Sequence, residues 1–249
     1  SRRCAYCVIP RARGPVRSRD EASVLEELRR LSDAGYKEVV LTAISLPSYG
    51  TDSGTSLVEL IEKAAEVPGI ERIRLGSLDP DMLHDEDILR MAGVKKLCPQ
   101  FHLSLQSGCD KTLRAMRRPY TTAQYADIAA KLREAFGAEK VSFTTDVIVG
   151  FPGETEEDFE ASMAFVTGMQ FLKVHVFPYS RREGTAAYDF PGQVPEHEKE
   201  SRSRRMTAAV EEVRAAEVTA MQGRTASVLL ETPLSNTLFT GYTKQYLPV

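Results

Sequence analysis

The alternation of strand-like and helix-like segments constrains the fold of this chain more than any other feature. Short apolar runs, rich in β-branched residues, recur between amphipathic segments at 38–42, 70–75, 101–105, 141–149 and 171–177. Five strands that alternate with helices predict an α/β fold with a parallel sheet and right-handed crossovers. The pattern does not separate a doubly wound sheet from a closed or partial barrel. No glycine-rich dinucleotide or nucleoside-triphosphate fingerprint follows a strand, so a barrel is favoured.

Capping signals predict where several of the helices begin. The sequence places capping boxes at Ser18 with Glu21, at Thr121 with Gln124 and at Thr155 with Asp158. Further helices are expected at 57–65 and 85–91. The acids Glu154, Glu156, Glu157, Asp158 and Glu160 are interpreted as a charged first turn that complements the helix dipole, which is a structural role.

The last third of the chain has a different organisation. A proline-rich break at 191–195 precedes a long helix, expected to run from Pro195 to about Met221. Two short β segments follow at 226–230 and 238–242 with no helix between them. We therefore expect three parts: a partial barrel over 1–194, a connecting helix over 195–222 and the start of a small β domain over 223–249.

Composition excludes several classes of protein. The 249 residues carry a net charge of -3, which argues against a protein that is basic all over but permits local basic patches. No apolar run reaches the length of a membrane span, and no signal peptide opens the chain, so we expect a cytoplasmic protein without membrane contact. The four cysteines, Cys4, Cys7, Cys98 and Cys109, are therefore expected as thiols or thiolate ligands rather than disulfides.

Cys4 and Cys7 form a C-x-x-C pair in an arginine-rich opening segment. Thiolates bind soft metals and iron–sulfur clusters, but this spacing alone is equally compatible with two unliganded thiols. A zinc ribbon would need a second such pair, and a thioredoxin-type site would need the pair at a helix start after a strand. Cys98 and Cys109 fit neither pattern, so we interpret them as buried structural thiols.

Several longer motifs make the interpretation of the C-x-x-C pair more specific. The opening sequence SRRCAYCVIPRARG resembles the end of the C-x-x-x-C-x-x-C loop of radical S-adenosylmethionine (SAM) enzymes, in the version that methylthiotransferases use. The similarity continues in Tyr49-Gly50 and in the blocks at 102–108, 145–155 and 175–185. The last block, with segments 241–243 and 246–249, resembles the MtaB branch, which modifies N6-threonylcarbamoyladenosine in tRNA. The resemblance covers nearly the whole chain.

The resemblance implies cofactors and roles for individual residues. In the family, three thiolates hold a [4Fe-4S] cluster that binds SAM and, once an electron donor has reduced it, cleaves SAM to a 5'-deoxyadenosyl radical. Cys4 and Cys7 would be two of the three cluster ligands. Residues expected to bind SAM lie mainly at strand ends, where parallel barrels place their ligands: Tyr6, Thr42, Ala43, Gln106, Ser107, Ile148, Gly150 and Tyr179. Each polar residue could instead cap a strand end, and each glycine could serve only a turn. No catalytic acid or base is assigned.

The resemblance also implies a tRNA anticodon loop as partner, from which the target adenine would be splayed out. Basic residues that follow successive strands could contact its phosphates. They are Arg11, Arg13, Arg17, Arg19, Lys111, Arg114, Arg117, Arg118, Arg181 and Arg182. Scattered solvated charges are the alternative interpretation.

The chain departs from the family pattern at its ends. The first cluster cysteine would directly precede Ser1, and a second, auxiliary [4Fe-4S] cluster would belong to a preceding domain. The β segments from residue 223 resemble the start of an RNA-binding TRAM domain. We therefore expect a fragment that is inactive by itself. Ala43 and the segment 44–47 replace a stretch that usually contains glycine.

Three alternatives stay open from the sequence. The substrate could be isopentenyladenosine tRNA or a ribosomal protein, or the chain could belong to a noncatalytic RNA-binding relative. A metal-independent barrel hydrolase or aldolase is disfavoured, since no lysine or His-Asp constellation stands at the strand ends.

Overall fold

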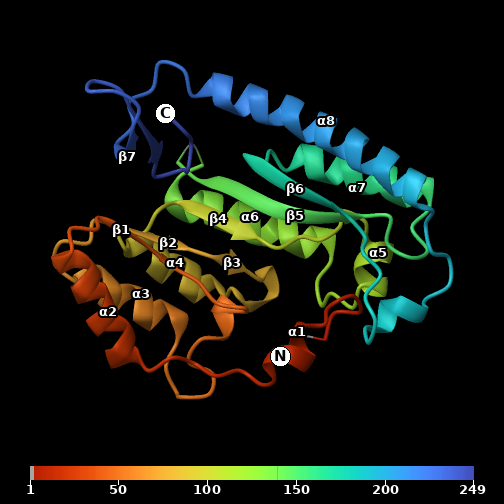
Figure 1. Ribbon diagram of the computed structural model, residues 1–249, viewed down its shortest axis with the longest axis horizontal. Coiled ribbons are helices and arrows are strands. Elements are labelled where there is room, and N and C mark those ends of the chain that lie inside the picture. Colours follow the sequence, from red (N-terminus) through yellow and green to blue (C-terminus); the bar gives the residue numbers. More distant parts are fainter. Residues whose placement is uncertain (1–2, 139) are drawn as a thin grey trace. The chain divides into compact units, whose positions relative to one another are not determined.

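A computed structural model describes residues 3–138 and 140–249, and it has the expected alternation of strands and helices (Figure 1). The strands are β1 (Glu38–Leu41), β2 (Arg72–Leu75), β3 (Ser77–Leu78), β4 (Gln100–Leu103), β5 (Ser142–Val149), β6 (Lys173–Pro178), β7 (Val228–Pro233) and β8 (Phe239–Thr243). The α-helices are α1 (Ile9–Arg13), α2 (Glu21–Asp33), α3 (Leu57–Glu66), α4 (Asp85–Gly93), α5 (Asp110–Ala115), α6 (Thr122–Phe136), α7 (Glu156–Gly168) and α8 (Glu196–Ala220). Short 3-10 helices are η1 (Leu46–Ser48), η2 (Pro80–Met82) and η3 (Ala186–Asp189).

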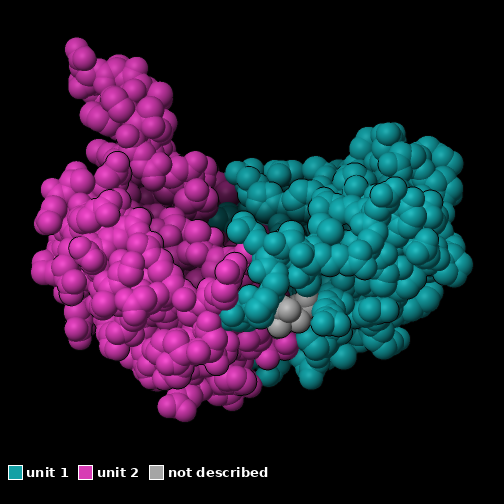
Figure 2. All heavy atoms as spheres, turned by 60° about the horizontal axis from the view of Figure 1, so that its bottom comes forward, with its two compact units in different colours: residues 1–16, 103–129, 143–217 teal, residues 17–102, 130–142, 218–249 magenta. Residues whose placement is uncertain are grey.

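The chain forms two compact units, coloured separately in Figure 2. Unit 1 contains residues 1–16, 103–129 and 143–217. Unit 2 contains residues 17–102, 130–142 and 218–249. Each unit therefore combines segments that are far apart in the sequence, and each is described by itself.

The core of unit 2 is built on a parallel strand pair. β1 pairs with β2 from Glu38 opposite Arg72 to Leu41 opposite Leu75. Helix α3 begins at its cap Ser56, whose side chain accepts a hydrogen bond from the Glu59 amide. The helix buries an apolar face consisting of Leu57, Val58, Leu60, Ile61 and Ala64. This is the strand-then-helix packing that the sequence predicts for a parallel α/β fold.

The C-terminal β segments of unit 2 are held by two buried arginines of β2. β7 and β8 pair antiparallel, with a register shift between Leu230 and Thr232. Arg72 donates to the carbonyls of Tyr242, at 3.0 Å, and Ser227, at 2.9 Å. Arg74 donates to the carbonyl of Lys244 at 3.1 Å. We call Glu38, Arg72 and Arg74 with these carbonyls the arginine clasp.

Glu38 supplies the negative charge of the arginine clasp. Its two carboxylate oxygens accept hydrogen bonds from Nε and one terminal nitrogen of Arg74, at 2.9 and 3.2 Å. Arg72 approaches the same carboxylate at 3.6 Å. The Arg74 guanidinium also lies 4.7 Å from the centre of the Tyr246 ring. The clasp thus combines a bidentate ion pair, which is the strongest arginine–carboxylate geometry, with backbone acceptors.

Unit 1 contains the second parallel strand pair. β5 pairs with β6 from Thr144 opposite Lys173 to Val149 opposite Pro178, and a parallel bridge joins Val147 to Gln106. Helices α7 and α8 run side by side (Figure 1), and Arg205 of α8 pairs with Glu156 and Glu160 of α7. Large aromatic side chains fill the core: Tyr125, Phe143, Phe151, Phe159 and Phe171 are each at most 2% exposed.

Some expectations about local structure are confirmed and others are wrong. The capping boxes at Thr155 and Thr121 are present. Helix α2, however, is capped by Asp20, which accepts from the Ser23 amide, whereas the Ser18 hydroxyl donates to Asp52. The helix cap is therefore Asp20, two residues after Ser18, although Ser18 has the spacing of a capping box with Glu21. The β segments after residue 223 are displaced by a few residues from their expected positions.

No helix in the described part of the chain is both long enough and apolar enough to cross a membrane.

Candidate functional site

The C-x-x-C segment of unit 1 is a turn fixed on both sides by backbone hydrogen bonds. The Cys7 amide donates to the Cys4 carbonyl at 3.1 Å, which closes the turn. Between the cysteines, the Ala5 amide donates to the carbonyl of Met116 at 3.0 Å, and the Ala5 carbonyl accepts from the amide of Ala187 at 2.8 Å. Ala5 is 1% exposed, whereas both cysteines are half-buried. The segment is thus ordered while its thiols stay accessible.

Aromatic residues from three parts of unit 1 meet at this turn. The Tyr6 ring lies edge-on to Phe151, with centroids 6.4 Å apart, and Phe151 contacts Tyr179 at 5.2 Å. Ile148 packs against the same cluster. Burial raises the pKa of Tyr6, so its hydroxyl stays protonated. Three residues expected to bind SAM, namely Tyr6, Ile148 and Tyr179, are therefore brought together beside Cys4 and Cys7.

Tyr179 carries a buried hydroxyl that lacks a hydrogen-bond partner within the described residues. The residue is 3% exposed, and its backbone is fixed between β5 and α8, because its amide donates to Val149 and its carbonyl accepts from Lys199 Nζ at 3.1 Å. Burial raises the pKa of this hydroxyl, although Arg181 opposes the shift. A buried hydroxyl without a partner is unfavourable, so this atom is suited to a polar group of a ligand.

Gln106 and Ser107 lie between β4, which ends at Leu103, and α5, and Gln106 forms an isolated parallel bridge to Val147. Gln106 has a φ of 72°, and its backbone exchanges hydrogen bonds of 2.9 Å with Asp146 and Ile148 of β5. Ser107 is fully buried, and its hydroxyl accepts from the Cys109 amide at 3.2 Å. The positive φ of Gln106 is uncommon outside glycine and marks strained backbone between β4 and α5.

Gly150 ends β5 in a conformation that favours glycine, with a φ of 71°. Its amide donates to Glu154 Oε1 at 2.7 Å, and the same oxygen accepts from Arg202 at 2.9 Å. An added Cβ would overlap Cγ of Lys199. The expectation that Glu154 belongs to the charged first turn of a helix is wrong, because helix α7 begins two residues later and Glu154 is 7% exposed. Burial raises its pKa, and the Gly150 amide and Arg202 oppose that rise.

Thr42 and Ala43 belong to unit 2, where they directly follow β1 and are exposed. Gly76 lies against Thr42, since a Cβ at Gly76 would come 2.9 Å from Thr42 Oγ1. Their proposed contact with SAM stays a prediction.

Arg118 is the feature that sequence reasoning missed. It was grouped with basic residues that would contact RNA phosphates, and this is wrong, because it is 9% exposed. One terminal nitrogen donates to Cys4 Sγ at 3.3 Å, and Nε donates to the Tyr120 hydroxyl at 2.9 Å. Burial disfavours its charge, but Tyr120, Tyr6 and Cys4 outweigh burial, and its pKa is raised. Arg118 is thus a permanent buried cation at the C-x-x-C turn.

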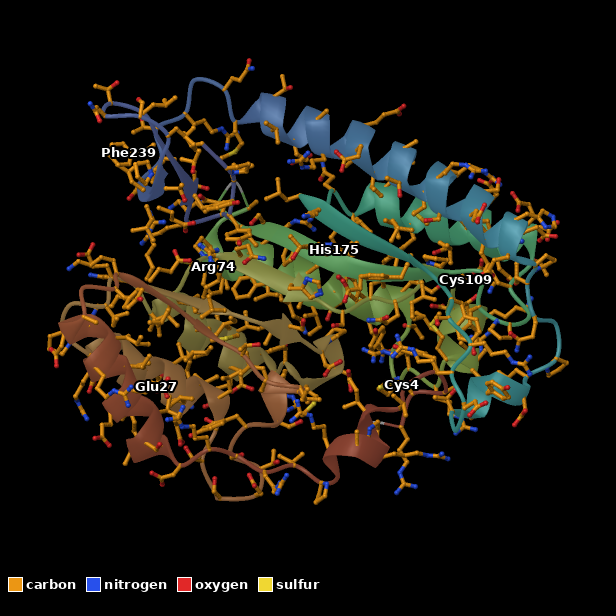
Figure 3. All side chains as sticks on the ribbon, viewed as in Figure 1. Cys4, Glu27, Arg74, Cys109, His175 and Phe239 are labelled. Atoms are coloured by element: carbon orange, nitrogen blue, oxygen red, sulfur yellow. The ribbon has the colours of Figure 1, made fainter. Side chains whose placement is uncertain are left out.

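The two remaining cysteines, Cys98 and Cys109, are buried and have other surroundings than the C-x-x-C turn. Cys109 donates weakly to Asp158 at 3.6 Å, and burial raises the pKa of Cys98. Among residues 3–138 and 140–249, no group of three or more His, Cys, Asp or Glu side chains could hold a metal ion. Cys4 and Cys7 (Figure 3 labels Cys4) are therefore the thiols best placed for a cofactor.

In unit 1 the two-cysteine turn, packed on aromatic side chains, offers two half-buried thiols that are suited to bind a cofactor. The family comparison specifies the class: the chain belongs to the radical SAM superfamily, whose model matches residues 1–166. Proteins of this superfamily use a [4Fe-4S] cluster and SAM.

The curated relatives are methylthiotransferases that modify tRNA. A tRNA-2-methylthio-N(6)-dimethylallyladenosine synthase of Clostridium novyi (strain NT) is 38% identical over 94% of this chain and 52% of its own length. A threonylcarbamoyladenosine tRNA methylthiotransferase MtaB of Chlamydia pneumoniae is 39% identical over 92% of this chain and 53% of its own length. The chain thus spans about half the length of the curated relatives it matches.

Solved structures confirm the predicted fold class. Methylornithine synthase (PylB) superposes with a TM-score of 0.58 at 14% identity, over 87% of this chain and 66% of that one. The coproporphyrinogen III oxidase HemN from Escherichia coli gives 0.59 at 14% identity, over 85% and 50%. The fold is the partial α/β barrel of radical SAM enzymes, with parallel strands and a small antiparallel sheet at its C-terminus.

The residues at the turn fit these cofactors. Two half-buried thiols are suitable iron ligands, and the Arg118 guanidinium complements an anionic thiolate-bound cluster. The Tyr179 hydroxyl, which has no hydrogen-bond partner among the described residues, and the Tyr6 ring of the same cluster offer a polar and an aromatic contact to a ligand such as SAM.

Proposed function

We propose that this chain is part of a radical SAM methylthiotransferase that adds a methylthio group to C2 of N6-threonylcarbamoyladenosine in tRNA. The observation that carries the proposal is the ordered turn of Cys4 and Cys7, packed on the Tyr6, Phe151 and Tyr179 cluster in a member of the superfamily. The sequence block 175–185 motivates the threonylcarbamoyl branch. We further propose the anticodon loop as partner and the cytoplasm as location.

Within this proposal the residues have distinct tasks. Cys4 and Cys7 hold the cluster, and Tyr6, Gln106, Ser107, Ile148, Gly150 and Tyr179 of unit 1 bind SAM. For Thr42 and Ala43, which belong to unit 2, SAM binding stays a prediction from the sequence. A reduced [4Fe-4S] cluster with bound SAM supplies radical chemistry. Met116 and Ala187 fix the position of the turn through Ala5, and the apolar cluster excludes water beside it.

A second candidate substrate is dimethylallyladenosine in tRNA. It is favoured by the relatives that are named for this nucleoside and match at 38–40% identity, about as well as the MtaB relative. A ribosomal protein is the third candidate, which the relatives do not favour.

The test uses the full-length protein, reconstituted anaerobically with iron and sulfide. Iron content, 5'-deoxyadenosine formed from SAM after dithionite reduction, and modified nucleosides by mass spectrometry are measured. We expect cluster assembly, SAM cleavage and 2-methylthio-N6-threonylcarbamoyladenosine in tRNA, all lost on Cys4→Ala or Cys7→Ala. Cys109→Ala is the matched control and should keep the cluster. Detection of 2-methylthio-dimethylallyladenosine instead would show that the second candidate is the substrate. A folded protein that assembles no cluster and cleaves no SAM would refute the proposal that the protein is a radical SAM enzyme.

A further inference from the structure

Arg118 and Cys4 form a contact that connects a permanent positive charge to a proposed cluster ligand. The distance from the Arg118 terminal nitrogen to Cys4 Sγ is 3.3 Å, which is within hydrogen-bond range for sulfur. Hydrogen bonds to the sulfurs of an iron–sulfur cluster, and the charge near it, are principal determinants of its reduction potential.

The surroundings of Arg118 keep its guanidinium in this position. Nε donates to the Tyr120 hydroxyl at 2.9 Å, and that hydroxyl donates in turn to the carbonyls of Ser104, at 2.6 Å, and Leu105, at 2.9 Å. The guanidinium carbon lies 4.9 Å from the centre of the Tyr120 ring. The Arg118 amide also donates to the Leu113 carbonyl at 2.9 Å. The orientation of the cation is thus fixed by the end of α5 and by residues 104–105, which follow β4.

We propose that Arg118 is a positioning residue that raises the reduction potential of the cluster held by Cys4, an inference that rests on the proposed function. When the oxidised cluster accepts one electron from dithionite, which is itself oxidised, the negative charge at Cys4 Sγ increases and no bond or proton need move. The N–H donor and the guanidinium charge stabilise the reduced form more than the oxidised form. Arg118 therefore eases the uptake of the electron that SAM cleavage requires.

The experiment is a redox titration of the reconstituted full-length protein, followed by the electron paramagnetic resonance signal of the reduced cluster. Arg118→Met removes the donor and the charge. We expect its midpoint potential to become more negative, so that at the wild-type midpoint the ratio of reduced to oxidised cluster falls roughly threefold to tenfold. The matched control is Arg214→Met, which changes an exposed arginine of the same unit and should leave the midpoint unchanged.

Two further variants keep the test decisive if Arg118→Met does not fold. Arg118→Lys keeps the positive charge but cannot donate to both Cys4 Sγ and the Tyr120 hydroxyl in the same way. Its midpoint potential should therefore lie between those of Arg118→Met and the unmodified protein. Tyr120→Phe keeps Arg118 but removes the acceptor of its Nε–H, and should shift the midpoint in the same direction by a smaller amount. Unchanged midpoints in cluster-loaded Arg118→Lys and Tyr120→Phe, or in Arg118→Met, would overturn the inference. Absence of a cluster in the unmodified protein would instead overturn the proposed function.

Discussion

Two buried arginines, Arg74 in unit 2 and Arg118 in unit 1, are held in different ways. Arg74 donates to both oxygens of Glu38 and to the Lys244 carbonyl, so its charge is neutralised within the arginine clasp (Figure 3 labels Arg74). Arg118 donates to a thiol and a phenol at the C-x-x-C turn. The first arrangement fixes the C-terminal segment, while the second directs a cation toward a reactive group. Burial of an arginine therefore does not by itself reveal its role; the chemistry of its acceptors does.

Breaking the arginine clasp should give the largest effect on stability. Glu38→Gln leaves Arg74, whose side chain is 5% exposed, without its carboxylate, and Arg72 loses the same partner. Removing one member of a buried ion pair lowers the free energy of unfolding by about 3–5 kcal/mol. Urea denaturation measures the change.

An exposed pair provides the control for the clasp. Lys37 and Glu71 lie 3.5 Å apart with side chains 49% and 69% exposed, so Glu71→Gln should change the stability by at most about 1 kcal/mol. A Glu38→Gln protein as stable as this control would show that the clasp contributes nothing.

A substitution at Gly150 tests the rigidity of the unit 1 site and should have an intermediate effect. Gly150→Ala forces a Cβ into the left-handed region at a φ of 71° and against Lys199, which should cost about 2 kcal/mol of stability. Gly153→Ala has a φ of 81° but open space, so it isolates the backbone contribution, expected near 1 kcal/mol. Thermal unfolding of the two variants measures the difference, and equal losses would contradict a role for Lys199.

The substitution with the smallest expected effect on stability should increase stability rather than lower it. Tyr179→Phe removes a buried hydroxyl that has no partner in the part of the chain that the structure describes, and it should raise the stability by about 1 kcal/mol. If this hydroxyl contacts SAM, the affinity of the reconstituted protein for SAM should fall by roughly threefold to tenfold. Tyr36→Phe, at a residue 59% exposed, is the control. Lower stability of Tyr179→Phe together with unchanged SAM affinity would contradict this assignment.

The same substitution has a defined pH dependence. Burial raises the folded-state pKa of Tyr179 above its ordinary value of about 10. The unfolded state therefore ionises first, so the stability of the unmodified protein is independent of this group below about pH 10 and falls as the pH rises from there through the folded-state pKa. The stability advantage of Tyr179→Phe should grow above about pH 10, which denaturation at several pH values can measure.

The fold was predictable because its signals are local. The capping box at Thr155 and Asp158 lies within four consecutive residues, and short apolar runs indicate the strands of the parallel fold. The family resemblance predicted that the C-x-x-C pair lies near residues expected to bind SAM, and the structure brings three of these, Tyr6, Ile148 and Tyr179, together. Residue contacts with SAM itself stay predictions.

The errors arose where a partner distant in the sequence determines the role. Arg118 was grouped with phosphate-binding residues because nothing near it indicates its partner Cys4. Glu154 resembled a first-turn acid, but Arg202 binds it in the interior. Ser18 resembled a helix cap, but it binds Asp52 instead. In each case a polar side chain found a more distant partner than the local pattern suggested.

The attachment of Ala5 to Met116 and to Ala187 has a consequence for the order of folding. The turn that carries Cys4 and Cys7 is synthesised well before Ala187, whose amide donates the second hydrogen bond to Ala5. Contacts of such large sequence separation form late, because the intervening chain must lose its conformational freedom first. The turn can therefore take its final form only after Ala187 has been made, and we expect any metal loading at this turn to be a late event in the maturation of the protein.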